Sequence, residues 1–368
     1  MFSNSSEALR IKILERRRKM PSTSIRKRKS SCVSCSWFCT RSEDSESPDH
    51  QEVLVKEAEF DLFDRRNGSV GSDAVSFYSA EDCGDQTYLP GDDVSLDNTF
   101  PMGASIPHRS IDPSGTAWSH CSHELFRIRT GPNYKKNGLK APSLSFLYEP
   151  FGVDVLRSDV VISNIAPHLL FPQLPEYYDP ACGLPALLVI NTQLPSMMPS
   201  MFSSPESDPG FSCLTYYKIR KETVAWALDA ATAPAALGVF KKLLAKGFSE
   251  RSLAFKAIGM IHDIEGEDLP MKSLITKYNG KPVLVTASST FHFGSAPYPY
   301  LEIDYNVRKW SILARTTLVQ LVDKIKSLTV HVGHLVEATD NEDLPERMLG
   351  GISVHHLDLQ GAKYVKFD

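Results

Sequence analysis

A chain of 368 residues with 42% hydrophobic and 23% charged residues is long enough to bury one sizeable core. It has no run of about 18 consecutive apolar residues, which argues against a membrane-spanning helix, and charges occupy the N-terminal positions where a signal peptide is apolar. Its seven cysteines are odd in number and scattered, so we expect reduced thiols in a cytoplasmic protein that is peripheral to membranes.

The first 117 residues are predicted to be a disordered arm with two oppositely charged parts. Residues 10–29 contain ten Lys or Arg, whereas residues 41–97 contain sixteen Asp or Glu against four Lys or Arg. The net charge of -4 hides this asymmetry. Apolar periodicity is weak in the arm, so it cannot bury enough surface to offset its chain entropy. The folded domain is expected at residues 118–368.

The basic head of the arm is interpreted first as a membrane-binding segment. Its cations would attract anionic lipid, each by about 1 kcal/mol near the surface. Cysteines beside polybasic residues suit reversible palmitoylation, and no metal is expected because a fourth zinc ligand at proper spacing is absent. A nuclear import signal, a nucleic-acid patch and an inert tail are the alternatives, with nucleic acid the less favoured partner. The cations are Arg16, Arg17, Arg18, Lys19, Arg26, Lys27, Arg28 and Lys29, and the cysteines are Cys32, Cys35 and Cys39.

The acidic part of the arm contains DAVSFYSAEDCGD at residues 73–85, which resembles the FFAT motif recognised by VAP proteins of the endoplasmic reticulum. Aromatic side chains and a small alanine would fill pockets on the partner, while the carboxylates would steer the peptide to a basic surface. A serine replaces the usual aspartate, so phosphorylation there would restore the charge. The alternative is a plain solubilising linker. The motif positions fall on Ser76, Phe77, Tyr78, Ser79, Ala80 and Asp82.

The first half of the domain is predicted to form strands and then helices. Extended segments are expected at residues 144–148, 153–162, 187–193 and 211–219. The third of these is typical of a strand that is buried on both faces and stopped by Pro195. Helices are expected at residues 222–230, 233–246 and 248–264, with Pro234 at the start of the second and Gly247 at its end.

The C-terminal part returns to extended patterns interrupted by one long helix. Strands are expected at residues 283–290, 298–306, 328–337 and 351–359, and a wide apolar stripe at helical spacing predicts a helix over residues 307–328. Helices that are grouped rather than strictly alternating with strands indicate an α+β fold. The predicted architecture is a largely antiparallel curved sheet with the long helix packed over it.

Four collinear pieces of the domain resemble the enhanced disease resistance 2 C-terminal family of plants and protists. They are HELFRIRTGPNYKKNGLKAPS at residues 123–143, LPALLVINTQLPS at 184–196, PYLEIDYNV at 299–307 and LPERMLGGISVHHLDL at 344–359. The chain departs from the family after YLEID, where an aspartate and a Gly-Ser turn are usual. In the plant relatives the domain follows lipid-binding PH and START domains, for which this chain has no room. The resemblance implies no enzymatic role and no cofactor.

No pattern in the domain gives positive support to catalysis. Glu302 and Asp304 are two apart on a predicted strand, so they share a face and could act as an acid and base pair. The favoured alternative is a face that is solvated or paired with Lys and Arg. A phosphate-cradling glycine loop and the common hydrolase motifs are absent from the sequence.

The histidines are interpreted as structural. His331 and His334 are three apart, and His355 and His356 are adjacent. On a strand neither spacing places two imidazoles together on one face, as a metal site would require.

Two functions of different class follow from these observations. The first is a non-enzymatic lipid-binding or lipid-transfer adaptor at contacts between the endoplasmic reticulum and another membrane, with lipid held between sheet and helix. The second is a protein-interaction scaffold or signalling regulator with a solid core. The predicted lipid pocket uses Arg308 or Lys309 for a phosphate and Leu318 and Leu321 for its apolar lining.

Overall fold

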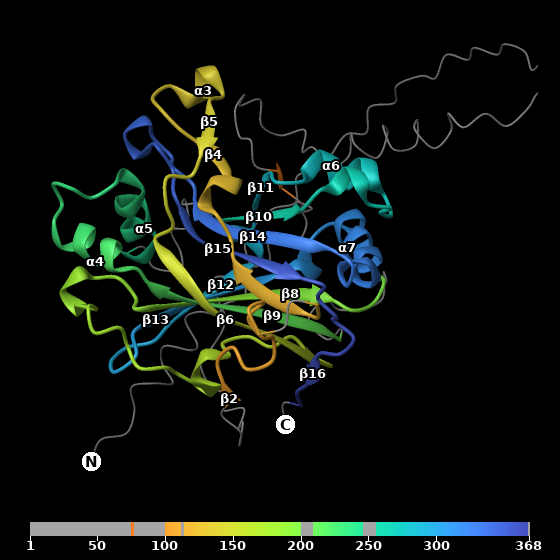
Figure 1. Cartoon of the computed structure of the whole chain (residues 1–368). Coiled ribbons are helices and arrows are strands. Elements are labelled where there is room, and N and C mark those ends of the chain that lie inside the picture. The colour runs from red at the N-terminus through yellow and green to blue at the C-terminus, as the bar shows by residue number, and fades with distance from the viewer. Residues whose placement is uncertain (1–74, 77–99, 112–113, 200–208, 246–254, 367–368) are drawn as a thin grey trace, which may run out of the picture. The chain divides into compact units, whose positions relative to one another are not determined.

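The extended segments of the sequence pair into two six-stranded sheets in the computed structural model, which describes residues 75–76, 100–111, 114–199, 209–245 and 255–366 (Figure 1). The first sheet has the order β1-β11-β10-β14-β15-β3, and the second has the order β12-β13-β8-β9-β6-β16. Most neighbouring strands are antiparallel, but β13 pairs in parallel with β8, β16 with β6, and β1 with β11. The predicted α+β class and the largely antiparallel pairing are confirmed.

The strands of the first sheet are β1 (Val75–Ser76), β11 (Pro282–Leu284), β10 (Phe255–Ile261), β14 (Thr329–Val336), β15 (Met348–His355) and β3 (Ala117–His120). Those of the second are β12 (Ser289–Phe293), β13 (Tyr300–Asn306), β8 (Leu187–Pro195), β9 (Gly210–Ile219), β6 (Tyr148–Ser158) and β16 (Lys363–Tyr364). Two small sheets join β2 (Phe100–Pro101) to β7 (Leu169–Leu170) and β4 (Arg127–Arg129) to β5 (Lys140–Pro142).

The main apolar core lies between the two large sheets, because its side chains come from strands of both. The sheets meet closely where β9 faces β15: a Cβ added to Gly350 would lie only 2.6 Å from the ring of Tyr217. Glycine at this position therefore lets the two backbones approach over an aromatic ring. The predicted antiparallel strands are thus divided between two sheets, which cover each other's apolar faces.

The helices lie at the margins of the sheets. They are α3 (Tyr134–Asn137), α4 (Lys221–Leu228), α5 (Ala235–Ala245), α6 (Lys272–Tyr278) and α7 (Ile312–Ile325). Helix α7 begins at an N-cap, Ser311, whose hydroxyl accepts a hydrogen bond from the N–H of Ala314 at 3.3 Å. It is shorter than the predicted helix because residues 307–309 form a separate 3-10 turn, η7 (Val307–Lys309).

One predicted helix is wrong. Residues 255–261 form β10, which pairs with β14 on one side and β11 on the other, although a helix was expected over residues 248–264. Its apolar run is too short to distinguish the period of a helix from that of a strand. Hydrogen bonds to the neighbouring strands β11 and β14 stabilise the extended form. Strand β6 joins the end of the strand predicted at residues 144–148 to most of the one predicted at 153–162, but residues 144–147 and 159–162 lie outside it. The last predicted strand, at residues 351–359, is observed from Met348 to His355.

The fold also extends N-terminal of the predicted domain boundary at residue 118. Strand β2 pairs with β7, and Ile106 is buried beside Val153. The N–H groups of Gly103 and Ser105 donate to the two oxygens of Asp154 at 2.7 and 2.6 Å. The segment around Ile106 therefore packs on the second sheet, and His108 pairs with Trp118 of β3 in the first sheet, so this segment is part of the fold.

Candidate functional site

Helix α7, which carries the predicted lining of a lipid pocket, contacts two apolar clusters. Leu318 and Ile325 are half-buried and touch both the main core and a smaller cluster. Leu321 belongs to the smaller cluster and is buried. Its partners there are Ile261, Ile264, Leu269 and Leu328. The predicted lining residues Leu318 and Leu321 thus lie on the apolar side of α7, at the seam between these clusters.

The two predicted head-group cations lie in different environments at the entrance of α7. Arg308 is only 1% exposed, and a Cβ added to Gly210 would lie 2.7 Å from its guanidinium. Its backbone N–H donates to Oδ1 of Asn306 at 2.9 Å, which caps η7. Lys309 is half-buried. Of the two candidates, Lys309 therefore reaches the surface, whereas Arg308 lies in the interior against the start of β9.

The carboxylates of Glu302 and Asp304 share one face of β13, as predicted, but this face is buried, and no Lys or Arg in the described part of the chain pairs with it. Both residues are buried. Oε1 and Oε2 of Glu302 accept hydrogen bonds from the backbone N–H groups of Ile165 and Ala166 at 2.8 and 2.7 Å. The favoured alternative from the sequence is wrong, because a loop crosses this face and supplies backbone donors.

Asp304 is held by four polar neighbours. Its Oδ2 accepts from Ser163 Oγ at 2.6 Å and from the N–H of Asn164 at 3.0 Å, and it lies 3.1 Å from His292 Nε2. Its Oδ1 accepts from Asn191 Nδ2 at 3.0 Å. The arrangement fixes the segment at residues 163–166 to one face of the second sheet, over β13 and β8, which is a structural use of two carboxylates.

The two carboxyl groups differ in the direction of their pKa shifts. Burial, followed by the adjacent Asp304, raises the pKa of Glu302 well above its usual value. Burial also acts to raise the pKa of Asp304, but hydrogen bonds from His292 and Ser163 and the neighbouring Glu302 outweigh it and hold this pKa below its ordinary value. Of the two carboxyl groups, Glu302 is therefore the one that holds a proton more readily.

The predicted structural histidines make contacts within the protein. His334 is 1% exposed and stacks on Phe255 with ring centroids 5.7 Å apart, and burial lowers its pKa to about 3. His331 lies on the opposite face of β14, where its Nδ1 is 2.7 Å from Ser353 Oγ. Nε2 of His355 is 2.8 Å from Ser119 Oγ. Among the described residues no group of three or more His, Cys, Asp and Glu is arranged to hold a metal ion.

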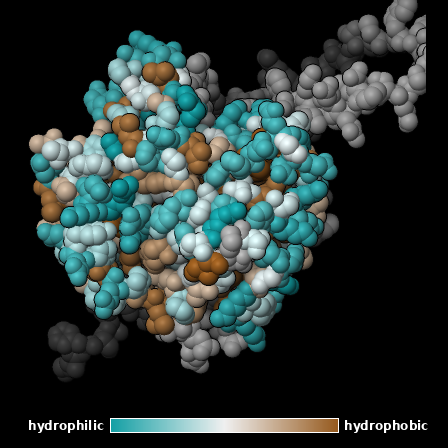
Figure 2. Space-filling model, in the orientation of Figure 1, coloured by the Kyte–Doolittle hydropathy of each residue, from teal (hydrophilic) through white to brown (hydrophobic). Residues whose placement is uncertain are grey.

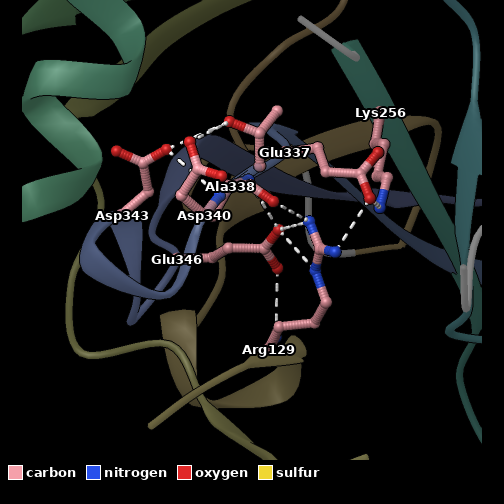
Figure 3. A network of polar contacts seen from close by, with 8 residues as sticks. Arg129, Lys256, Glu337, Ala338, Asp340, Asp343 and Glu346 are labelled. Carbon is pink, nitrogen blue, oxygen red and sulfur yellow. Dashed lines mark hydrogen bonds and ion pairs between the residues drawn. The ribbon is translucent and has the colours of Figure 1, made fainter. Parts of the chain in front are cut away.

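A network of buried ion pairs, which the sequence did not single out, centres on Arg129 (Figure 3). Its Nε and Nη2 donate to Oε1 of Glu346 at 2.8 and 2.6 Å, and its Nη1 lies 2.8 Å from Oε1 of Glu337. Lys256 Nζ reaches the same Glu337 oxygen at 3.0 Å. Nη2 of Arg129 also donates to the carbonyl of Ala338 at 2.8 Å. Two cations and two carboxylates thus join β4, β10, the end of β14 and the chain before β15.

This network explains two of the sequence pieces on which the family resemblance rests. Arg129 lies in the piece at residues 123–143 and Glu346 in the piece at residues 344–359, and the two backbones are also joined by a hydrogen bond from the N–H of Glu346 to the carbonyl of Arg129 at 3.0 Å. Strand β4 reads Arg127-Ile128-Arg129, and the sequence marks Arg129 only as a charged residue next to an apolar one. Sequence spacing alone does not indicate its partner more than 200 residues away.

Several predicted site residues lie outside the described part of the chain. They are the eight cations of the basic head, Cys32, Cys35 and Cys39, and five of the FFAT-like positions, Phe77, Tyr78, Ser79, Ala80 and Asp82. The remaining position, Ser76, is in β1, whose backbone pairs in parallel with β11. Membrane binding, lipidation and VAP binding by these residues stay predictions.

Comparison with known proteins gives one family match. Residues 118–358 match the family described as Protein ENHANCED DISEASE RESISTANCE 2, C-terminal. A relative from Arabidopsis thaliana named Protein ENHANCED DISEASE RESISTANCE 2-like is 40% identical over 63 residues, which is 17% of this chain and 9% of the relative. No solved structure matches the chain. No helix in the described ranges is long and apolar enough to cross a membrane.

Proposed function

Since the chain belongs to the enhanced disease resistance 2 C-terminal family, we propose that it is a non-enzymatic lipid-binding or lipid-transfer adaptor on intracellular membranes. In this proposal the folded domain holds a lipid beneath α7, and the arm tethers the protein to the endoplasmic reticulum through a VAP-type partner. Because the match with the Arabidopsis relative spans 9% of that protein, the proposal rests on the domain's own geometry rather than on the relative.

The observation that carries the proposal is the seam under α7. Leu318 and Ile325 are half-buried between two apolar clusters, and the helix begins beside the surface cation Lys309. A helix that covers an apolar seam while remaining partly exposed can shift to admit an acyl chain, and a cation at its entrance suits a phosphate head group. The carboxylates of β13 give no competing support to catalysis, because each of their oxygens already accepts a hydrogen bond from the protein.

Replacing Leu318 by Trp tests this proposal. If a lipid occupies the seam, the larger ring fills its space, so that copurified lipid is lost in native mass spectrometry while the melting temperature stays near that of the wild type. In a solid core the ring overpacks and destabilises the domain by roughly 1 to 3 kcal/mol. Ile312→Trp, at an exposed position on the same helix, is the matched control. Wild-type protein without lipid would contradict the proposal.

The tethering part of the proposal has its own test. A peptide covering residues 71–84 and phosphorylated at Ser79 should bind a VAP domain more tightly than the unmodified peptide, because the phosphate supplies the charge of the missing aspartate. Phe77→Ala should abolish binding by removing an aromatic anchor. Calorimetry that detects no binding by the phosphorylated peptide would remove this part and leave the lipid site untouched.

A second candidate function, a protein-interaction scaffold with a solid core, is favoured by the contact between β9 and β15. There Gly350 leaves no space above the ring of Tyr217, so the two sheets touch without room for a ligand at that point. This contact restricts the proposed lipid to the α7 end of the sandwich. A reduced melting temperature of the Leu318→Trp variant, together with absence of lipid from the wild type, would select the scaffold.

A further inference from the structure

The two sides of the hairpin formed by β4, α3 and β5 differ in their exposure to solvent. The strands pair antiparallel from Arg127 opposite Pro142 to Arg129 opposite Lys140, in a sheet of their own. In Figure 1 this hairpin projects beyond the two large sheets, with α3 at its tip. A projecting two-stranded hairpin is marginal by itself, so its conformation depends on contacts at its base.

The inner side of the hairpin is anchored to the buried ion pairs. Tyr134, the first residue of α3, is 4% exposed and lies beneath the guanidinium of Arg129, whose Cζ is 5.3 Å from the ring centroid. The N–H of Asn133 donates to Oδ1 of Asn341 at 3.1 Å. Because Arg129 is itself fixed by Glu346, the tip is held in one orientation relative to the first sheet.

The outer side presents two cations and, three residues further along the chain, an exposed leucine. Lys135 and Lys136 are exposed and form no ion pair with any residue that the structure describes. Leu139, which follows the left-handed C-cap Gly138 (φ 59°), is 53% exposed, and Leu144 beyond β5 is 60% exposed. At the end of the molecule where Figure 1 places α3, Figure 2 shows a hydrophobic side chain surrounded by hydrophilic ones.

An anionic bilayer surface satisfies both features of this tip. The lysine ammonium groups gain Coulomb energy near acidic head groups, and the exposed Leu139 gains by leaving water for the interfacial region. An acidic protein partner would satisfy the lysines, but leucines spread over a convex tip offer no groove or continuous flat patch for a protein surface. We infer that the β4–α3–β5 hairpin docks the domain on anionic membranes through Lys135, Lys136 and Leu139.

Negative charge at the base of the hairpin has to be considered as well. The 3-10 turn η8 (Asn341–Asp343), which accepts the bond from Asn133, carries the exposed carboxylate of Glu342 and follows that of Asp340. Repulsion from Glu342 weakens the attraction of the tip to acidic lipid. Replacing Glu342 by Gln should therefore strengthen docking, which gives a change opposite in sign to that of the lysine variants.

This inference rests on the proposed association with membranes, and it names the part of the domain that makes the contact. Its test uses the full chain with all ten Lys and Arg of residues 10–29 replaced by Gln in every sample, so that the electrostatic binding that remains does not come from the basic head. Vesicles of phosphatidylcholine, with or without about 30 mol% phosphatidylserine, are sedimented at low salt, where surface electrostatics is strongest.

We expect Lys135→Gln/Lys136→Gln to lower partitioning onto the anionic vesicles about tenfold or more. Leu139→Ser should lower it as well, and Glu342→Gln should raise it. The control Lys221→Gln/Lys281→Gln removes two exposed lysines elsewhere and should leave binding unchanged. Equal binding by the hairpin variant and the control, or no anionic preference in the parent chain, would overturn the inference.

The outcome is separable from that of the lipid site under α7. The hairpin variants should retain any copurified lipid, since their positions do not touch the α7 clusters. Leu318→Trp should retain vesicle binding. Absence of copurified lipid from the wild type, with vesicle binding intact, would therefore count against the α7 site and leave the hairpin as the membrane contact. Vesicle binding that persists in the hairpin variants refutes the hairpin alone.

Discussion

Two clusters of buried charge stabilise different parts of the domain by different means. In the cluster at Arg129, two cations face two carboxylates, and every charged group has an opposite charge within 3.0 Å. In the cluster at Glu302 and Asp304, two carboxylates lie on one strand, and their partners are backbone N–H groups, a serine, an asparagine and a histidine. The first cluster is balanced in charge, whereas the second gathers negative charge in the interior.

The difference determines how each cluster responds to change. A balanced buried network becomes costly when one partner is removed, because an uncompensated charge stays behind. A carboxylate pair with neutral donors can lower its charge by holding a proton, so it responds to pH instead. The first cluster joins distant segments into one fold, and the second fixes a single loop to one face of a sheet.

The largest expected effect is that of Glu346→Ala. The substitution leaves Arg129 buried with only part of its charge compensated, and it removes the acceptor of three hydrogen bonds from that residue. The free energy of unfolding, measured by urea titration, should fall by about 3–5 kcal/mol. Glu342→Ala, at an exposed position nearby, should change it by at most about 0.5 kcal/mol. Equal effects of the two variants would show that the network does not hold the fold.

A smaller loss is expected from Glu302→Gln. The amide keeps one carbonyl oxygen for a backbone donor but places an NH2 group against the other, so either Ile165 or Ala166 loses its acceptor. Leaving one buried N–H without an acceptor costs about 1–3 kcal/mol. Equilibrium unfolding at pH 4.5, where the stability from the bound proton is still present, measures the loss. A cost as large as that of Glu346→Ala would mean that Glu302 is ionised and compensates a charge.

The pH dependence of this variant sharpens the comparison further. The pKa of Glu302 is raised in the folded state, so above pH 4.5 the native protein holds a proton that the unfolded chain has released. The stability that results is fully present below pH 4.5 and is lost as the pH rises through the folded pKa. The slope is at most about 1.4 kcal/mol per pH unit. The stability difference between wild type and Glu302→Gln should therefore shrink as pH rises above 4.5; a constant difference would contradict the assignment of the proton.

The smallest effect is expected at an exposed ion pair, which serves as a reference for both clusters. Lys218 Nζ lies 3.1 Å from Oε1 of Glu149, and both side chains are about 40% exposed. Lys218→Gln should change the free energy of unfolding by less than about 1 kcal/mol, because solvent screens the pair. A loss comparable with that of Glu346→Ala would show that burial is not what distinguishes the Arg129 network.

Much of the local structure could be predicted from periodicity. Strands β8, β9, β13 and β14 and helices α4 and α5 lie close to the predicted ranges, because their apolar residues recur at a clear period or in runs with marked ends. The wrong prediction of a helix at β10 has the opposite cause, because this segment has no clear period of its own. Its sequence FKAIGMI is short and apolar, and only its neighbours β11 and β14 give it the extended form.

The predicted site was less complete than the predicted fold. The sequence placed Leu318 and Leu321 on the apolar side of a helix, and α7 confirms this placement. It did not show that Arg308 is interior, because burial of a cation depends on a neighbour such as Gly210, almost 100 residues earlier in the chain. The roles of Arg129 and Glu346 were missed for the same reason.

The sequence by itself determined the class of the fold, the family and the period of most elements, because these depend on the order of apolar and polar residues within a short window. Only the tertiary structure decided that the strands divide into two sheets and that Glu302 faces a loop rather than water. It also decided that Arg129 binds Glu346 while the lysines beyond it stay exposed. Burial and charge pairing are properties of distant segments brought together, so the pattern of any one segment does not contain them.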